Sequence, residues 1–106
     1  MTALSFDEVK PILAEFGRRH AAIQKLEVFG SAASGRTTDR SDLDVLVSFG
    51  ADAPLDLRYF RFFTGLQEEL EQLTGRKVDL LDRGALSEDI FSRTVARGAK
   101  TVYERR

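Results

Sequence analysis

The segment 41–49, Ser-Asp-Leu-Asp-Val-Leu-Val-Ser-Phe, constrains the fold most, because two aspartates interrupt an otherwise apolar strand pattern. Side chains alternate between the faces of a strand, so Asp42 and Asp44 share one face, and Leu43, Val45 and Val47 occupy the other. The two carboxylates would lie roughly 7 Å apart and repel each other, and aspartate is a poor strand former. A bound divalent cation removes this conflict, since hard oxygen ligands suit Mg²⁺.

A second motif precedes this strand. Residues 25–29 predict a short strand that runs into Gly30-Ser31, and ten residues separate Ser31 from Asp42. Glycine lets a backbone approach a ligand closely, and a helical turn over 31–34 would direct free N–H groups at a phosphate. Gly-Ser is also common in turns, and aspartate at a strand start is often a solvated end or a turn cap. The ordered combination is more specific than either motif and indicates nucleotide chemistry.

Periodicity and turn residues predict the remaining elements. Pro11 lies past the first turn of the first helix, so that helix either bends there or begins its regular part near Val9. The expected elements are a helix from about residue 5 to 17–20, strands at 25–29 and 41–49, a helix at 55–73, a strand at 76–81, a helix at 86–97 and a strand at 101–103.

Two residues outside these motifs leave alternatives open. Phe60 lies off the apolar stripe of the long helix, which consists of Tyr59, Phe63, Leu66, Leu70 and Leu73. It either widens the core contact or marks a partner surface. His20, the single histidine, is expected to be a surface residue rather than a metal ligand or a base.

A third aspartate lies inside the apolar strand that follows the long helix. Asp79 could simply face water on an edge strand. Because Asp42 and Asp44 lie upstream, a third metal-site carboxylate is the better interpretation. Asp82 is the rival, on the opposite face of the strand and nearer its end.

Length and charge bound the class of protein. The 106 residues suffice for one domain, expected to span 1–106, and 16 basic residues nearly balance 17 acidic ones. A net charge of −1 argues against a protein that binds long nucleic acid through its phosphates. The chain has no cysteine, and its sequence predicts no membrane span and no signal peptide, so the expected location is the cytoplasm.

The order Gly30-Ser31, Asp42-x-Asp44 and a later strand with Asp79 resembles the DNA polymerase β-type nucleotidyltransferase superfamily, most closely its minimal, MNT-type branch. The resemblance covers almost the whole chain. It departs in one place, because the family often has Ala-Arg-Gly after Gly-Ser-x. Here the residues are Ala33-Ser34-Gly35, so Ser34 replaces the usual basic residue and Arg36 comes one place after the glycine, which could weaken triphosphate binding.

The resemblance implies an α+β fold of the polymerase β-like palm type, with a small mixed β-sheet packed against helices. It also implies a metal-dependent transfer of a nucleotidyl group from an NTP to a hydroxyl, with two Mg²⁺ ions. Carried over by position, Asp42, Asp44 and Asp79 are the catalytic and metal-binding carboxylates. Gly30 and Ser31 are the nucleotide-binding residues.

The family also suggests the acceptor. Many MNT-type proteins are antitoxins encoded beside HEPN-domain toxins, and some transfer AMP to a tyrosine of that toxin. The leading hypothesis is therefore a type VII-like antitoxin that uses ATP and forms an oligomer with its HEPN toxin. Two alternatives remain open, a binding-only antitoxin without turnover and a small-molecule nucleotidyltransferase completed by another subunit.

Overall fold

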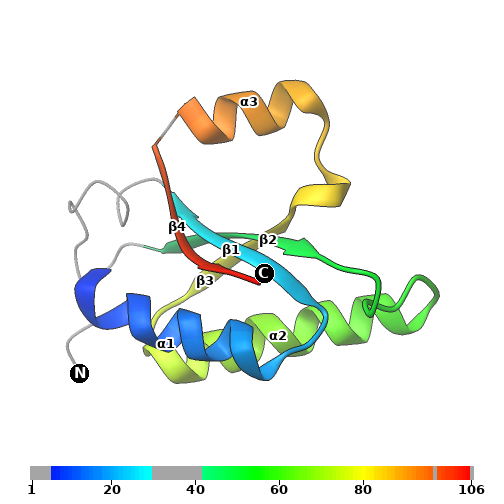
Figure 1. Cartoon of the computed structure of the whole chain (residues 1–106), viewed down its shortest axis with the longest axis horizontal. Coiled ribbons are helices and arrows are strands. Elements are labelled where there is room, and N and C mark those ends of the chain that lie inside the picture. Colours follow the sequence, from blue (N-terminus) through cyan, green and yellow to red (C-terminus); the bar gives the residue numbers. More distant parts are fainter. Residues whose placement is uncertain (1–5, 30–41, 97, 106) are drawn as a thin grey trace.

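The computed structural model describes residues 6–29, 42–96 and 98–105, which form one four-stranded sheet and its covering helices (Figure 1). This arrangement confirms the predicted α+β class. The elements are α1 (Phe6–Arg19), β1 (Ile23–Phe29), β2 (Leu43–Phe49), α2 (Arg58–Thr74), β3 (Val78–Asp82), the 3₁₀ turn η1 (Arg83–Ala85), α3 (Glu88–Ala96) and β4 (Ala99–Glu104).

The sheet is mixed, with strand order β3-β2-β1-β4. Strands β1 and β2 pair antiparallel, as do β1 and β4, whereas β2 and β3 are parallel. A parallel pair requires a crossover connection, and α2 provides it. The first aspartate strand is therefore central, and the strand that carries Asp79 is at one edge.

The core lies between the sheet and the pair of helices α1 and α2, which run side by side across one face (Figure 1). From β2, Leu43, Val45 and Val47 each expose 1% or less and point into this core, as their alternation predicts. They pack in one cluster with Leu13 of α1 and Leu70 of α2. Helix α3 stands on the other side of the sheet (Figure 1).

Helix α2 starts later than its sequence pattern predicts, at Arg58 instead of residue 55. Asp56 holds the preceding turn, because its Oδ1 accepts a hydrogen bond from the Arg58 backbone N–H at 2.9 Å. Hydrogen bonds from the Arg58 side chain, and secondly this backbone contact, lower the pKa of Asp56. As a result Leu55 and Leu57 lie outside the helix and are almost fully exposed.

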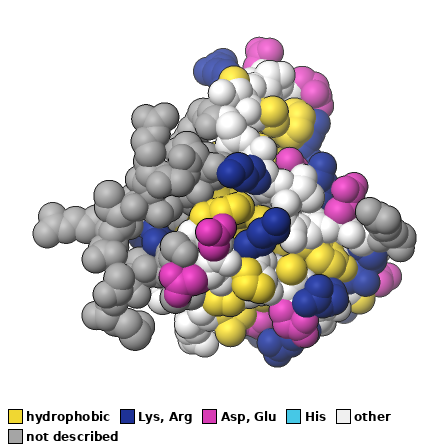
Figure 2. Space-filling model, turned by 60° about the vertical axis from the view of Figure 1, so that its left-hand side comes forward, with side chains coloured by type: hydrophobic (Ala, Val, Ile, Leu, Met, Phe, Trp, Pro, Cys, Tyr) yellow, Lys and Arg dark blue, Asp and Glu magenta, His cyan; other side chains and the backbone are white. Residues whose placement is uncertain are grey.

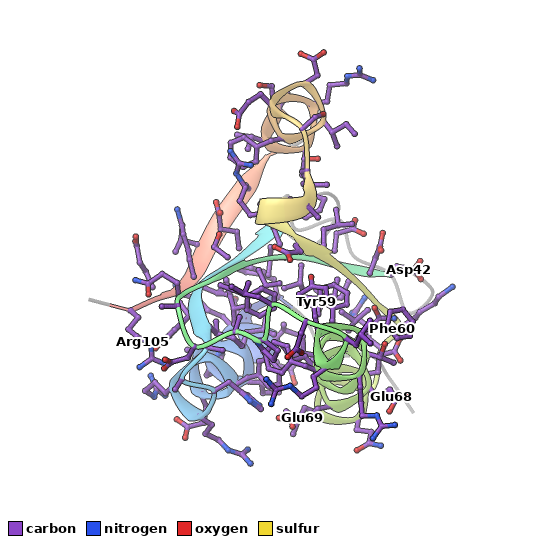
Figure 3. The ribbon with its side chains drawn as sticks, turned by 90° about the vertical axis from the view of Figure 1, so that its right-hand side faces the viewer. Asp42, Tyr59, Phe60, Glu68, Glu69 and Arg105 are labelled. Atoms are coloured by element: carbon purple, nitrogen blue, oxygen red, sulfur yellow. The ribbon has the colours of Figure 1, made fainter. Side chains whose placement is uncertain are left out.

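The apolar stripe of α2 is only partly buried. Leu66 and Leu70 enter the core as predicted, whereas Leu73 is 40% exposed. Phe60 is 78% exposed on the same helix (Figure 3), so the expectation that it widens the core contact is wrong. Its alternative role as a partner surface stays a prediction. Gly75 ends α2 in the left-handed conformation, with φ 68°.

The first helix continues from Phe6 through Pro11, so its regular part does not begin near Val9. His20 follows it, and its side chain is more involved in packing than a plain surface residue. Its Nε2 lies 3.0 Å from Glu69 Oε2 on α2, and its ring packs 4.5 Å from that of Phe16. His20 thus joins the end of α1 to α2.

Tyr103 and Arg105, near the end of the chain, contact the C-terminal part of α1 and the residue that follows it. Arg105 donates from Nη2 to the carbonyls of Gly17 and His20, at 3.0 and 3.2 Å. The same carbonyls also accept from the backbone N–H groups of His20 and Ile23, so Arg105 adds a second donor to each. The Tyr103 ring of β4 packs directly on Gly17, where an added Cβ would lie 2.4 Å from the ring. Only a glycine allows this approach of helix and strand.

Candidate active site

The parallel register of β2 and β3 brings two of the predicted aspartates together. Asp44 pairs with Asp79, so the two residues are direct neighbours on adjacent strands. Their Cα atoms are about 4.8 Å apart in such a pair, and their side chains point to the same face. That face is opposite to the one covered by α1 and α2, because the flanking Val45 and Val78 are buried in the core.

Asp42 lies at the same end of the sheet, immediately before β2, and is exposed (Figure 3). The backbone here is held by a hydrogen bond from the Leu43 N–H to the Lys77 carbonyl, at 2.9 Å. Phe29, the last residue of β1, pairs with Asp44 from the other side. The strand that leads to Gly30 therefore ends beside the central aspartate.

Gly30 and Ser31 lie outside the described residues, as do the predicted turn at 31–34 and the departure at Ser34 and Arg36. Their proposed contact with phosphate stays a prediction. Phe29, the last described residue before them, lies at the end of the sheet where Asp44 is.

Asp79 and Asp82, the two candidate carboxylates of β3, have different surroundings in the structure. Asp82 is on the core side of β3, and its carboxylate accepts hydrogen bonds from the Tyr59 hydroxyl of α2 and from the Gly84 N–H at 2.8 Å. Burial, together with the adjacent Asp82 carboxylate, raises the pKa of Tyr59 far above its ordinary value, so the hydroxyl remains a donor. Asp82 is thus a structural acceptor at the other end of β3, away from Asp44.

One residue of this edge was missed by the sequence reasoning. Lys77 directly precedes β3 and is exposed, while its carbonyl is bound to the backbone that follows Asp42. Extending the register by one residue places Lys77 next to Asp42, on the face of Asp44 and Asp79. Its spacing of two residues before Asp79 was the available signal. Lys77 brings a positive charge to a cluster of carboxylates.

The carboxylates fit a magnesium ion that is coordinated jointly by the protein and by substrate phosphates, and not one enclosed by protein ligands alone. In residues 6–29, 42–96 and 98–105, no group of three His, Cys, Asp or Glu side chains converges closely enough to hold a metal ion. Mg²⁺ is usually held by one or two carboxylates together with substrate phosphates, and keeps several waters. The neighbouring carboxylates of Asp44 and Asp79, with exposed Asp42, match that chemistry.

A profile of the nucleotidyltransferase domain family matches residues 8–104, and the chain belongs to this family. The protein adenylyltransferase MntA of Thermococcus cleftensis is 33% identical over 106 residues, which span 97% of this chain and 99% of that protein. A Methanocaldococcus jannaschii relative, also 33% identical, aligns over 98 residues that span 86% of this chain and 91% of its own length. These matches confirm the resemblance found in the sequence.

Solved structures show the same fold. A toxin–antitoxin crystal structure with AMP-PNP matches with a TM-score of 0.70 at 24% identity, over 92% of this chain and 74% of that one. The complex of tri-AMPylated Shewanella oneidensis HEPN toxin with MNT antitoxin has a TM-score of 0.66 at 22% identity, over 94% and 73%. A minimal nucleotidyltransferase structure has a TM-score of 0.69 at 25% identity, over 89% and 93%.

Proposed function

We propose that this chain transfers AMP from ATP to a hydroxyl, specifically a tyrosine hydroxyl, of a partner HEPN toxin in the cytoplasm and acts as its antitoxin. The observation that carries the proposal is the pairing of Asp44 with Asp79 at the end of the sheet where Asp42 and the end of β1 also lie. The near full-length match to the protein adenylyltransferase MntA supports the same chemistry.

The reaction forms one bond and breaks one. The acceptor oxygen attacks the α-phosphorus of ATP, and the bond from that phosphorus to the oxygen leading to the β-phosphate breaks, so pyrophosphate leaves. We assign the hydroxyl proton to a carboxylate of the Asp44–Asp79 pair or to water beside it. Mg²⁺, when bound, would neutralise phosphate charge and lower the pKa of the acceptor.

The predicted site residues contribute in distinct ways. Asp42, Asp44 and Asp79 would hold Mg²⁺ against the triphosphate, and Gly30 and Ser31 would bind the β- and γ-phosphates. Asp44 lies between its neighbours, since it pairs with Phe29 on one side and Asp79 on the other. We therefore expect Asp44 to hold the reacting groups in a more fixed orientation than Asp42 or Asp79 does, because central strands move less than exposed ends.

The test is direct transfer. The purified protein is incubated with α-labelled ATP, Mg²⁺ and the product of the adjacent gene, and the mass of each protein is measured by mass spectrometry. We expect mass increments of one or more AMP units on a tyrosine of the partner. A stable complex without label would replace this proposal with binding-only neutralisation. Absence of both label and complex would redirect the search to small-molecule acceptors.

Asp79→Asn is expected to lower the transfer rate by about 100-fold, since it removes one of two neighbouring carboxylates. Asp52→Asn is the matched control, because Asp52 is exposed in the loop after β2. It should keep wild-type activity. Initial rates of label transfer measure both variants, and an Asp79→Asn enzyme as fast as Asp52→Asn would remove Asp79 from the site.

Lys77→Ala is expected to raise the KM for ATP about tenfold with a smaller change in kcat, since an exposed ammonium beside the site would bind phosphate in the ground state. Lys77→Arg should restore most of the affinity. Saturation curves for ATP separate the two parameters. An unchanged KM in Lys77→Ala would show that the triphosphate lies elsewhere.

A further inference from the structure

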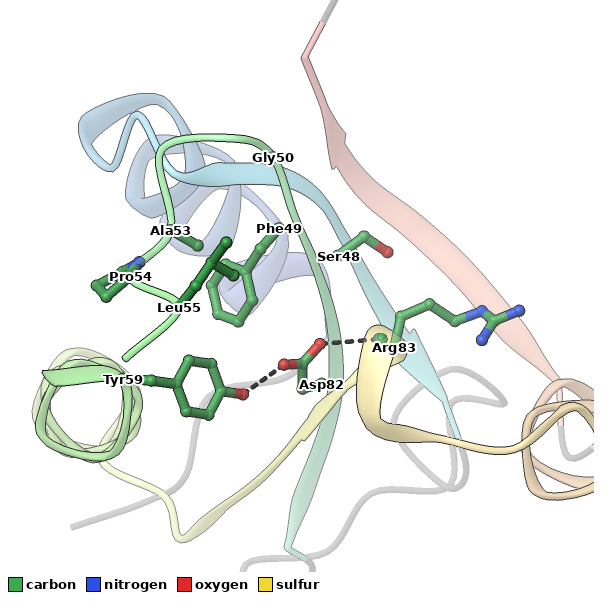
Figure 4. Close-up of a pocket in the computed structure, with 10 residues that line it drawn as sticks. Ser48, Phe49, Gly50, Ala53, Pro54, Leu55, Tyr59, Asp82 and Arg83 are labelled. Atoms are coloured by element: carbon green, nitrogen blue, oxygen red, sulfur yellow. Dashed lines mark hydrogen bonds between the residues drawn. The ribbon is translucent and has the colours of Figure 1, made fainter. Parts of the chain in front are cut away.

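A pocket of about 430 Å³ opens at the end of the sheet away from the aspartate pair. It lies where β2 and β3 end and α2 begins, and Figure 4 shows its lining. Ser48, at this end of β2, is four residues beyond Asp44, which corresponds to about 13 Å along a strand. The pocket is thus separate from the nucleotidyltransferase site, and the proposed function assigns it no role.

Its walls are aromatic and aliphatic. The Phe49 ring of β2 and the Tyr59 ring of α2 meet edge to face, with centroids 6.3 Å apart. Leu55 and Pro54 approach from the loop between β2 and α2 (Figure 4). Leu55 is 96% exposed, so this side of the pocket is open to solvent.

A carboxylate lies against these walls. Asp82 is half-buried, and the Tyr59 hydroxyl and the Gly84 N–H fix its two oxygens. Each carboxylate oxygen can accept a further hydrogen bond. Both present partners are neutral, so they orient the carboxylate without neutralising its charge.

No described cation neutralises Asp82. In the described part of the chain, no lysine, arginine or histidine forms an ion pair with it. Arg83 also lines the pocket, but its charged group is engaged elsewhere: its guanidinium lies 3.6 Å from the Phe91 ring centre and its Nη2 lies 2.9 Å from Glu88 Oε1. Figure 4 shows that Arg83 points away from Asp82.

We propose that this pocket binds an organic cation, an ammonium or guanidinium group on an alkyl chain. The cationic head would donate to Asp82, and its alkyl stem would pack on Phe49, Tyr59 and Leu55. Aromatic faces attract cations, and a charged hydrogen bond to a half-buried carboxylate is stronger than a neutral one. The volume falls within the range of small-ligand pockets.

The test compares probes that differ in charge. Butylamine and butan-1-ol have similar size, and backbone amide NMR shifts of Gly50 and Gly84 report on the pocket. We expect butylamine to shift both amides saturably and butan-1-ol to bind about tenfold more weakly or not at all. Equal affinities for the two probes, or shifts confined to other residues, would overturn the proposal.

Two further probes determine whether the bound cation is a side chain of a partner protein or a free amine. Nα-acetyl-lysine amide represents a side chain of a partner protein, and Nα-acetyl-norleucine amide is its neutral match. Tighter binding of the lysine probe than of butylamine assigns the site to a protein side chain, whereas the reverse order assigns it to a free amine. Both orders support a cation site, provided that the neutral matches bind more weakly.

A variant isolates the charge. Asp82→Asn keeps an oxygen that can accept from the Tyr59 hydroxyl but removes the negative charge, and should weaken butylamine binding about tenfold or more. Undiminished affinity in this variant would refute the role of Asp82. Should the variant not fold, the comparison of amine and alcohol on the wild-type protein still decides. None of these binding experiments requires a nucleotide, so their outcome does not depend on the transferase activity.

Discussion

Replacing Asp44 with Asn is expected to lower AMP transfer by about 10³-fold, the largest effect on activity that we foresee. Asp44 is the central member of the row Phe29–Asp44–Asp79, and Asp79 is the other carboxylate of that row, so the substitution leaves a single charge there. Asparagine has nearly the same shape but lacks the charge that would hold Mg²⁺ against the triphosphate. Initial rates of transfer to the HEPN partner measure the loss.

Binding provides the control for Asp44→Asn. The residue is only half-buried, and the change conserves volume, so thermal unfolding and complex formation with the partner should match the wild type. A variant that binds its partner but transfers no AMP separates catalysis from neutralisation by contact. Transfer within tenfold of wild type would contradict the role assigned to this carboxylate.

Gly17→Ala is expected to lower the free energy of unfolding by about 2 kcal/mol, the largest effect on stability among our predictions. The new Cβ would lie 2.4–2.8 Å from three Tyr103 ring carbons, so the ring and β4 must move away from α1. Alanine favours a helix by about 0.5–1 kcal/mol over glycine, which offsets only part of this cost. Urea unfolding measures the change.

Gly65→Ala is the matched control, since Gly65 lies in α2 and an added Cβ meets no atom within 4 Å. It should raise the free energy of unfolding by about 0.5–1 kcal/mol through helix propensity alone. Opposite signs for the two substitutions would attribute the Gly17 effect to Tyr103. Stabilisation by both would show that helix α1 and strand β4 adapt without cost.

Much of the fold could be predicted from local patterns. The alternation through Leu43, Val45 and Val47 correctly identified the central strand and its buried face, because one periodicity determines both. Boundaries were less accurate. Helix α2 begins at Arg58 because Asp56 stabilises a turn there, a contact that apolar periodicity does not register.

Phe60 shows a second limit of prediction from the sequence. A wider core contact was one of the two roles left open for Phe60, since apolar residues are usually buried, but its burial depends on what lies opposite that face of α2. No described element covers it, and 78% of the residue remains exposed. A hydrophobic pattern identifies candidates for contact, whereas the arrangement of neighbouring elements determines which of them are buried.

The sequence by itself determined the kinds of chemistry available: carboxylates at Asp42, Asp44 and Asp79, and the order of strands and helices along the chain. Only the tertiary structure decided that Asp44 and Asp79 are neighbours and that Asp82 turns to Tyr59 instead. The physical reason is register. Alternation along one strand assigns each side chain to a face, but hydrogen bonding between strands decides which residues of different strands meet.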